Sequence, residues 1–146
     1  MTEAELQRLV ETVSWTFFQR PFTHQAHFNR RLQTTGGRYH LKDHHLDFNY
    51  QLFQKVEQEV IVGIIKHELC HYHLHLQGLG FRHQDVDFKT LLAQTGGLRY
   101  APVEKKAKWC YRCQSCGQQY WRMRRVNLNK FGCGHCRGKL QLNQSN

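Results

Sequence analysis

The sequence predicts an α+β protein in two parts: a domain of helices with a small antiparallel sheet, followed by a small cysteine-rich module. Three observations predict this fold class. Apolar residues recur at helical spacing within 57–76, shorter β-like runs occupy 26–49, and two C-x-x-C pairs lie near the C-terminus. With 146 residues, of which 40 % are hydrophobic, the chain has material for one modest core and an appended module.

The first expected helix covers residues 3–18. Its apolar residues follow a helical period: Leu6, Leu9, Val10, Val13 and Phe17. Thr2 is the expected N-cap, with Glu5 three residues later completing a capping box. The helix should end before Pro21, because a proline disfavours helical backbone at the residue before it.

Three short strands are expected next, near 26–31, 37–42 and 45–49. Gly36-Gly37 is a strong turn signal between the first two, and Asp43-His44 is a weaker one before the third. We expect these strands to form a small antiparallel sheet.

The most strongly predicted helix covers 57–76. Its wide apolar face indicates a mostly buried helix, and Gly78 and Gly80 should end it. A further helix is expected over about 85–94, ended by Gly96-Gly97.

The buried helix contains the motif H-E-x-x-H, at His67, Glu68 and His71. Residues four apart lie on one helix face, about 6 Å apart along the axis, so both imidazoles can reach one zinc ion. Glu68 is offset by about 100°, which suits a base that deprotonates a water at the metal rather than a third ligand.

A zinc hydrolase needs a third protein ligand and one open position. His83, after the glycine break, is the best candidate, and the alternatives are Asp85, Asp87 and His135. His73 and His75 are expected to be solvated or packed, because His75 lies about 12 Å from His67 along the helix and His73 faces elsewhere. Cys70 is expected to be a small core residue.

The cysteine module contains Cys113/Cys116 and Cys133/Cys136, and each pair is followed closely by a glycine. Paired C-x-x-C turns joined by a hairpin-length segment predict a zinc ribbon, with the hairpin over 118–129. Cys110 and Cys113 form an alternative first pair. We favour Cys113/Cys116 because Gly117 completes the tight turn. Two zinc ions per chain are thus expected, one catalytic and one structural.

All of the excess positive charge lies near the C-terminus. Residues 1–104 contain 11 Lys+Arg and 11 Asp+Glu, whereas 105–146 contain 10 Lys+Arg and no carboxylate side chain. Basic and aromatic residues alternate there, as expected of a single-strand nucleic-acid binder. The candidate contacts are Trp121, Arg122, Arg124, Arg125 and Lys130. The alternative is a solvated basic face with its aromatics in a small core.

The sequence also predicts where the chain divides and which compartment it occupies. Pro102 and the lysines at 105–108 indicate a linker, giving a domain 1–104, a basic linker 105–108, a ribbon 109–142 and a tail 143–146. No apolar run matches a membrane span, and the N-terminus lacks a signal pattern, so a cytoplasmic protein is expected. In that reducing compartment the six cysteines suit metal binding better than disulfides.

Together these motifs resemble the SprT-like family, in its short bacterial branch. The resemblance depends on residues 34–39 (TTGGRY), on 64–72 around the H-E-x-x-H motif, on His83 with Asp87-Phe88, and on the four ribbon cysteines. It implies a compact zincin-type domain in which His67, His71 and His83 hold zinc. The family includes a eukaryotic protease that degrades proteins crosslinked to DNA. One departure is Gln84, where better-known members have glycine.

The predicted function is therefore a zinc metalloprotease acting on DNA-associated proteins, with Glu68 as the base. The sequence leaves the oxyanion-stabilising residue open among Arg38, Tyr39 and Tyr72. The rival hypothesis is a non-enzymatic, zinc-dependent nucleic-acid-binding protein. A fourth protein ligand closing the His67/His71 site would favour this rival, and an open position would favour the enzyme.

Overall fold

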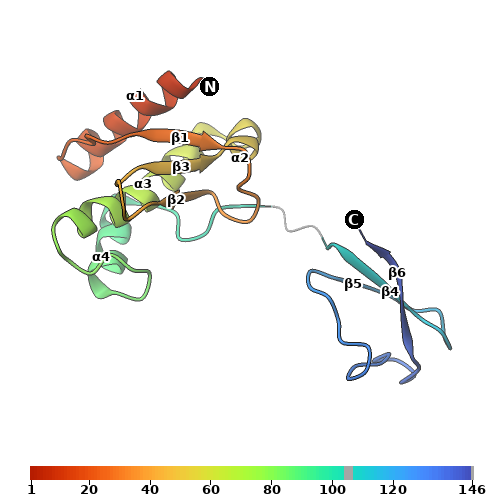
Figure 1. The fold of residues 1–146 in the computed structure, drawn as a ribbon. Coiled ribbons are helices and arrows are strands. Elements are labelled where there is room, and N and C mark those ends of the chain that lie inside the picture. The colour runs from red at the N-terminus through yellow and green to blue at the C-terminus, as the bar shows by residue number, and fades with distance from the viewer. Residues whose placement is uncertain (104–106, 146) are drawn as a thin grey trace. The chain divides into compact units, whose positions relative to one another are not determined.

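The computed structural model describes residues 1–103 and 107–145, and its contacts divide the chain into two compact units, Met1–Val103 and Glu104–Asn146. The first unit combines helices with a three-stranded sheet, and the second is built around another three-stranded sheet (Figure 1). The predicted α+β fold class is confirmed. Lys105 and Lys106 of the predicted linker lie outside the described residues.

The first helix, α1 (Glu3–Val13), begins as predicted, because the Thr2 hydroxyl accepts a hydrogen bond from the Glu5 amide at 3.1 Å. It ends earlier than predicted, since Ser14–Phe18 form a π-helix, η1. The buried Ser14 hydroxyl donates to the Arg20 carbonyl at 2.6 Å. It lies 2.8 Å from His73 Nε2, so the ring N–H of His73 donates to it. The bond to His73 holds the widened turn against the later helix that contains His73.

The sheet of the first unit consists of β1 (Ala26–Asn29), β2 (Gly37–Tyr39) and β3 (Leu46–Asn49), in the order β1-β3-β2. All three predicted strands are present. The prediction of an antiparallel sheet is wrong for one pair, because β1 and β3 are parallel while β2 and β3 are antiparallel. Every residue of β3 is buried, so this strand takes the centre and separates the two strands that precede it.

Three helices complete the first unit: α2 (Tyr50–Lys55), α3 (Gln58–Leu76) and α4 (Val86–Thr95). The last two confirm the predictions, and each is followed by a glycine with positive φ, Gly78 at +70° and Gly96 at +74°. The short α2 was not predicted. Its one local signal is Asn49, whose side chain caps the helix by accepting from the Leu52 amide.

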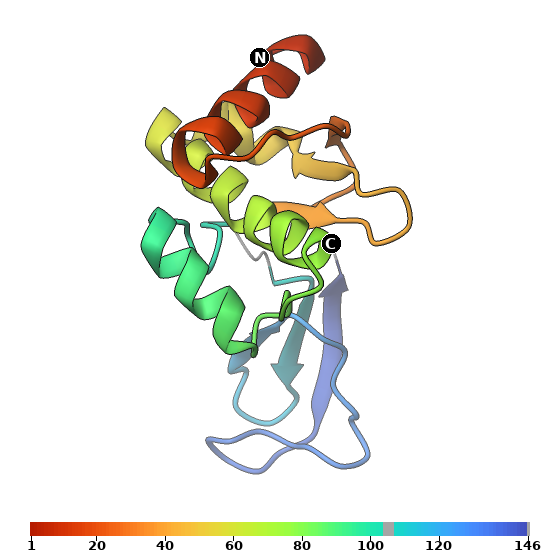
Figure 2. The same ribbon diagram turned by 90° about the vertical axis from the view of Figure 1, so that its left-hand side faces the viewer.

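One hydrophobic core joins α1, α3, α4 and the sheet, and α3 runs behind the sheet with α4 beside it (Figures 1 and 2). The predicted apolar face of α3 consists of Val60, Ile61, Ile64, Ile65 and Leu69. The last four are buried in this core, and Val60 packs against it partly buried. Within the described ranges, none of the helices has the length and apolarity needed to cross a membrane.

The second unit contains β4 (Trp109–Cys113), β5 (Gln119–Arg122) and β6 (Leu140–Ser145), in the order β5-β4-β6 with both pairs antiparallel. The predicted hairpin over 118–129 is wrong: the structure describes residues 123–139 in full and places no strand there. The first C-x-x-C turn is itself the hairpin turn, because the Cys113 amide donates to the Gln118 carbonyl at 2.9 Å. The sheet also continues past residue 142, to Ser145.

Candidate metal centres

Three imidazoles of the first unit converge on one point. The Nε2 atoms of His67 and His71 each lie 3.0 Å from His83 Nε2, and 3.3 Å from each other. A tetrahedral ion with Zn–N bonds of about 2.0–2.1 Å would separate its nitrogen ligands by about 3.3 Å. The three rings are therefore spaced as ligands of one metal ion.

Backbone carbonyls fix which nitrogen of each helical histidine faces this point. His67 Nδ1 lies 2.6 Å from the Leu98 carbonyl oxygen, and His71 Nδ1 lies 2.5 Å from that of Phe81. Because a carbonyl only accepts, each Nδ1 carries the proton and each Nε2 presents a lone pair. Two facing lone pairs cannot bond to each other, and a cation between them resolves the repulsion. The residues present thus fit a bound metal ion.

The protonation states agree with this arrangement. Burial lowers the pKa of His67 and of His71 to about 4, outweighing the carbonyl bonds that raise it. Burial also lowers the pKa of His83. All three rings are therefore neutral at pH 7, which is the form that binds metals.

The loop that carries His83 is shaped by the two aspartates considered as alternative ligands. The Asp85 carboxylate accepts from the Arg82 amide at 3.0 Å, and the Asp87 carboxylate accepts from the Gly80 amide at 2.8 Å. Neither belongs to the histidine cluster. His135, the third alternative, lies in the second unit, where its amide donates to Cys133 Sγ. Gln84 is exposed and leaves His83 free to join the cluster.

Phe88 of α4 forms an aromatic wall for the cluster that the sequence did not predict. Its buried ring stacks on His71 with centroids 4.4 Å apart, and it meets the edges of His67 and His83 at 5.3 and 5.2 Å. The apolar wall limits the rotation of all three imidazoles. The Leu98 and Phe81 carbonyls were also missed, because a backbone acceptor has no sequence signal.

Glu68 is buried beneath the sheet, against β2. A Cβ built on Gly37 would lie 2.9 Å from Glu68 Cγ and 2.9 Å from the Asp47 carbonyl oxygen, so only glycine permits this approach. Burial raises the pKa of the Glu68 carboxyl to about 8, although the nearby Arg38 charge opposes the shift. A divalent cation beside the carboxyl would favour its ionised form.

We expect Gly37→Ala to disturb this contact directly. The new methyl group must displace either Glu68 or the β3 backbone, so the free energy of unfolding should fall by about 1–3 kcal/mol. Chemical denaturation measures the loss. Gly134→Ala is the matched control, because its Cβ would meet only the Tyr120 hydroxyl at 3.9 Å. Equal stability of the two variants would contradict the close packing at Glu68.

The other polar residues near α3 have partners of their own. Buried His73 bonds to Ser14, and His75 Nδ1 lies 2.5 Å from the Tyr39 hydroxyl. The Tyr72 hydroxyl lies 2.6 Å from His24 Nδ1. Both histidines are packed, and both tyrosine hydroxyls are already engaged. Cys70 is buried in the core, as predicted.

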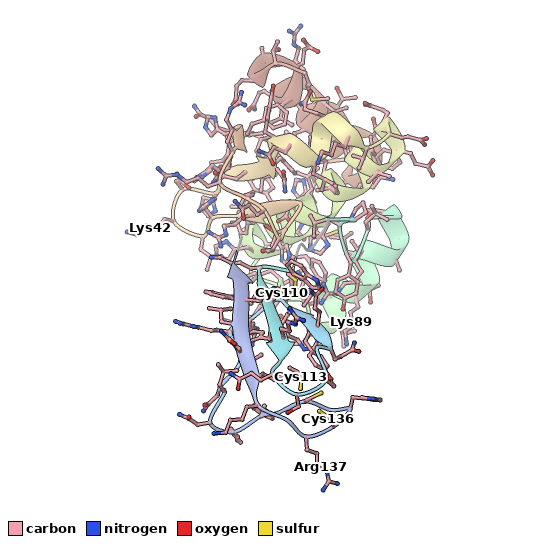
Figure 3. The ribbon with its side chains drawn as sticks, turned by 90° about the vertical axis from the view of Figure 1, so that its right-hand side faces the viewer. Lys42, Lys89, Cys110, Cys113, Cys136 and Arg137 are labelled. Atoms are coloured by element: carbon pink, nitrogen blue, oxygen red, sulfur yellow. The ribbon has the colours of Figure 1, made fainter. Side chains whose placement is uncertain are left out.

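In the second unit the four predicted ribbon cysteines also converge. Cys113 Sγ lies 3.4 Å from Cys136 Sγ, and Cys116 Sγ lies 3.7 Å from Cys133 Sγ. A tetrahedral ion with Zn–S bonds of about 2.3 Å would separate its sulfurs by about 3.8 Å. Cys110 is buried farther along β4, away from Cys113 and Cys136, as Figure 3 shows. All six cysteines are described, and none forms a disulfide.

Hydrogen bonds lower the pKa of two of the four thiols, Cys113 and Cys133, and so favour their thiolate forms. The Tyr120 hydroxyl, 3.1 Å from Cys133 Sγ, together with backbone amides lowers the pKa of that thiol to about 6. Gly117 and Arg137 follow their C-x-x-C pairs with φ of +79° and +63°, closing the two tight turns. The cluster therefore fits a metal bound by four thiolates.

The five predicted nucleic-acid contacts lie on the surface of the ribbon. Trp121 and Arg122 belong to β5, and Arg124, Arg125 and Lys130 lie in the segment after it; all are exposed. Trp121 has 43 % of its surface accessible. By contrast, Tyr111 is buried, and its hydroxyl accepts from the Val126 amide. Only some of the ribbon aromatics therefore form a small core.

The comparisons with known proteins agree with this architecture. Over 66 % of its length, this chain is similar in fold to a solved metallopeptidase zymogen, abylysin of Pyrococcus abyssi, with a TM-score of 0.51, 16 % identity and 84 % of that chain covered. Proteins named SprT-like are 59 % identical in Enterococcus faecalis and 49 % identical in Bacillus subtilis. The first match covers 96 % of this chain and 94 % of the relative, and the second 97 % of both. The SprT-like family model matches residues 6–110. The chain belongs to the SprT-like family.

Proposed function

We propose that this chain is a zinc-dependent metallopeptidase in which His67, His71 and His83 hold the zinc and Glu68 is the catalytic base. One observation carries the proposal: two helical imidazoles and one loop imidazole direct their Nε2 atoms to a single point, and a buried carboxylate follows the first of them on the same helix. The metallopeptidase fold supports it.

The chemistry follows from the residues of α3. A zinc ion bound there would act as a Lewis acid on the scissile carbonyl and would lower the pKa of a bound water. The Glu68 carboxylate takes a proton from the attacking water and can donate it to the leaving amine. The wall formed by Phe88 keeps the imidazoles in place during this transfer.

The substrate backbone should add to the sheet at β2. The other outer strand, β1, is blocked by α1: the Ala26 amide donates to the Gln7 side chain at 2.7 Å, and the Phe28 amide donates to Glu3 at 3.2 Å. Strand β2 is the opposite edge. Its register with β3 turns the N–H and C=O groups of Gly37 and Tyr39 outward, where an extended peptide can pair with them.

Of the three oxyanion candidates, Arg38 is favoured. The Tyr39 and Tyr72 hydroxyls are held by histidines. Arg38 is exposed and lies close enough to Glu68 to lower its pKa. Its positively charged guanidinium group can therefore move toward the developing negative charge of the oxyanion.

The rival hypothesis of a purely structural site is less well supported. Within residues 1–103 and 107–145, the cluster at His67 comprises three candidate ligands, and none of the neighbouring carboxylates joins it. Three protein ligands leave a coordination position for water or substrate, as catalytic zinc sites require. The four-cysteine cluster has the closed set of a structural site.

We further propose that the ribbon brings the peptidase to nucleic acid, with DNA-associated proteins as substrates. Exposed Trp121 and the surrounding cations provide a stacking surface and phosphate contacts. The second unit has 10 Lys+Arg and a single carboxylate side chain, Glu104, so it carries nearly all of the excess positive charge of the chain.

Metal content and casein hydrolysis test the proposal together. Native mass spectrometry should find two tightly bound zinc ions per chain, one at each cluster. Casein should be cleaved by the zinc-loaded protein, and chelation of the zinc should stop the cleavage. Folded protein that binds two zinc ions yet shows no cleavage, with or without single-stranded DNA, would instead favour the non-enzymatic rival.

A further inference from the structure

A third group of potential ligands lies apart from both metal centres, on the turn that joins β2 to β3. His40, His45 and Asp47 place their ligand atoms within 4.8 Å of one another. His40 Nε2 lies 2.9 Å from Asp47 Oδ2, and His45 Nε2 lies 3.4 Å from Asp47 Oδ1. Two imidazoles with one carboxylate are a common ligand set for divalent transition metals.

The environment of Asp47 sets this group apart from an ordinary surface ion pair. Only 10 % of the Asp47 side chain is exposed, because Asp47 belongs to the buried central strand β3. The carboxylate also accepts from the Asn29 amide group at 3.1 Å, which fixes its orientation. A buried carboxylate that is held in one orientation beside two imidazoles offers a cation a preformed negative ligand.

The outer contacts of His45 point to a metal. Its Nδ1 lies 2.5 Å from Asp43 Oδ1, so the N–H group at Nδ1 donates a hydrogen bond to that carboxylate. In the neutral ring, Nε2 then directs its lone pair at Asp47. A carboxylate that accepts from the second ring nitrogen commonly orients a histidine ligand toward its metal. The two acceptors, His45 Nε2 and Asp47 Oδ1, then face each other at 3.4 Å, and a cation can bind between them.

We propose that His40, His45 and Asp47 form a further site for a divalent transition metal such as Zn²⁺. His40 and His45 keep 30 % and 25 % of their side chains exposed, so water can complete the coordination shell. Their rings stack at 3.8 Å with an interplanar angle of 12° and must tilt to bring both Nε2 atoms to one ion. This site is therefore weaker than the His67 and cysteine clusters, and it responds to free metal when those are already filled.

An ion at this site would tie the 40–45 turn to the central strand. The turn leads directly from β2, the open edge strand, and ends at β3. Occupancy should therefore stiffen the edge on which an extended peptide would be placed, and it should raise the thermal midpoint as zinc is added.

The test uses the full chain with its two tight metals in place. Zn²⁺ is titrated by calorimetry and by native mass spectrometry, and a third, weaker equivalent is expected. His40→Gln should weaken that equivalent at least tenfold while leaving the first two unchanged. Asp43→Asn should weaken it by about 10–100-fold, because Asp43 acts on the ion only through His45.

His27→Gln is the matched control. His27 is a neighbouring histidine, with its ring 6.0 Å from His45, but it pairs with Glu3 and lies outside the cluster. This variant should keep the third equivalent and the zinc-dependent rise in thermal midpoint. The proposal is overturned if the wild-type chain takes up only two equivalents, or if His40→Gln and His27→Gln weaken the third to the same degree. In either case the cluster is only a hydrogen-bonded clamp on the turn.

Discussion

Glu68→Gln should abolish peptide hydrolysis while leaving the zinc in place. Glutamine keeps the shape of the side chain but cannot accept the proton of the attacking water. General-base catalysis contributes about 10²–10⁴-fold to a rate, so kcat should fall by at least that factor. Casein hydrolysis and metal content, measured on the same preparation, test both halves of the prediction.

Two further sets of variants serve as comparisons for Glu68→Gln. His67→Ala and His71→Ala should lose both activity and one equivalent of zinc, because each removes one of three converging nitrogens. Glu59→Gln is the matched control: it lies in the first turn of the same helix and is exposed, so activity and zinc should both persist. If Glu68→Gln retains the wild-type rate, another group is the base.

Removing the ribbon should remove most of the affinity for nucleic acid. Residues 1–103 contain 11 Lys+Arg and 10 Asp+Glu, a net charge of about +1 if histidines are neutral, and they hold a complete hydrophobic core. The second unit holds the remaining cations. Fluorescence anisotropy with a labelled single-stranded oligonucleotide should show weak binding by 1–103 and strong, salt-sensitive binding by the full chain.

Single substitutions distinguish stacking from charge. Trp121→Ala should cost about 1–3 kcal/mol of binding free energy at constant salt if bases stack on the ring. Replacing Arg124 or Arg125 should instead lower the salt slope by about 0.7 for each lost phosphate contact. Trp15→Ala is the control, since Trp15 is 59 % exposed but lies on η1 in the first unit. Equal affinity of the full chain and 1–103 would leave the ribbon with a structural role alone.

Features that depend on local spacing could be predicted from the amino-acid sequence. The four-residue interval of His67 and His71 needs only helical geometry, and the apolar face of α3 made that helix predictable. Glycines after α3 and α4 fixed where the helices end, because positive φ is a property of the single residue. The family motif and the fold class follow from the same short-range patterns.

Features that depend on contacts between distant segments could not be predicted in this way and became visible in the folded chain. The sequence predicted strands near 26–31 and 45–49, but not that β3 enters between its two predecessors. The burial of all four β3 residues decides this order. The predicted ribbon hairpin over 118–129 was wrong because it also depends on a distant partner. Strand β6 pairs with β4 from about thirty residues away along the chain, and no local signal marks that pairing. The same holds for the other unpredicted contacts of the metal centres. They are the bonds of the histidines to the Leu98 and Phe81 carbonyls, the packing of Phe88 on the histidines, and the cluster around Asp47. Each brings together residues from different elements or from the two sides of a turn.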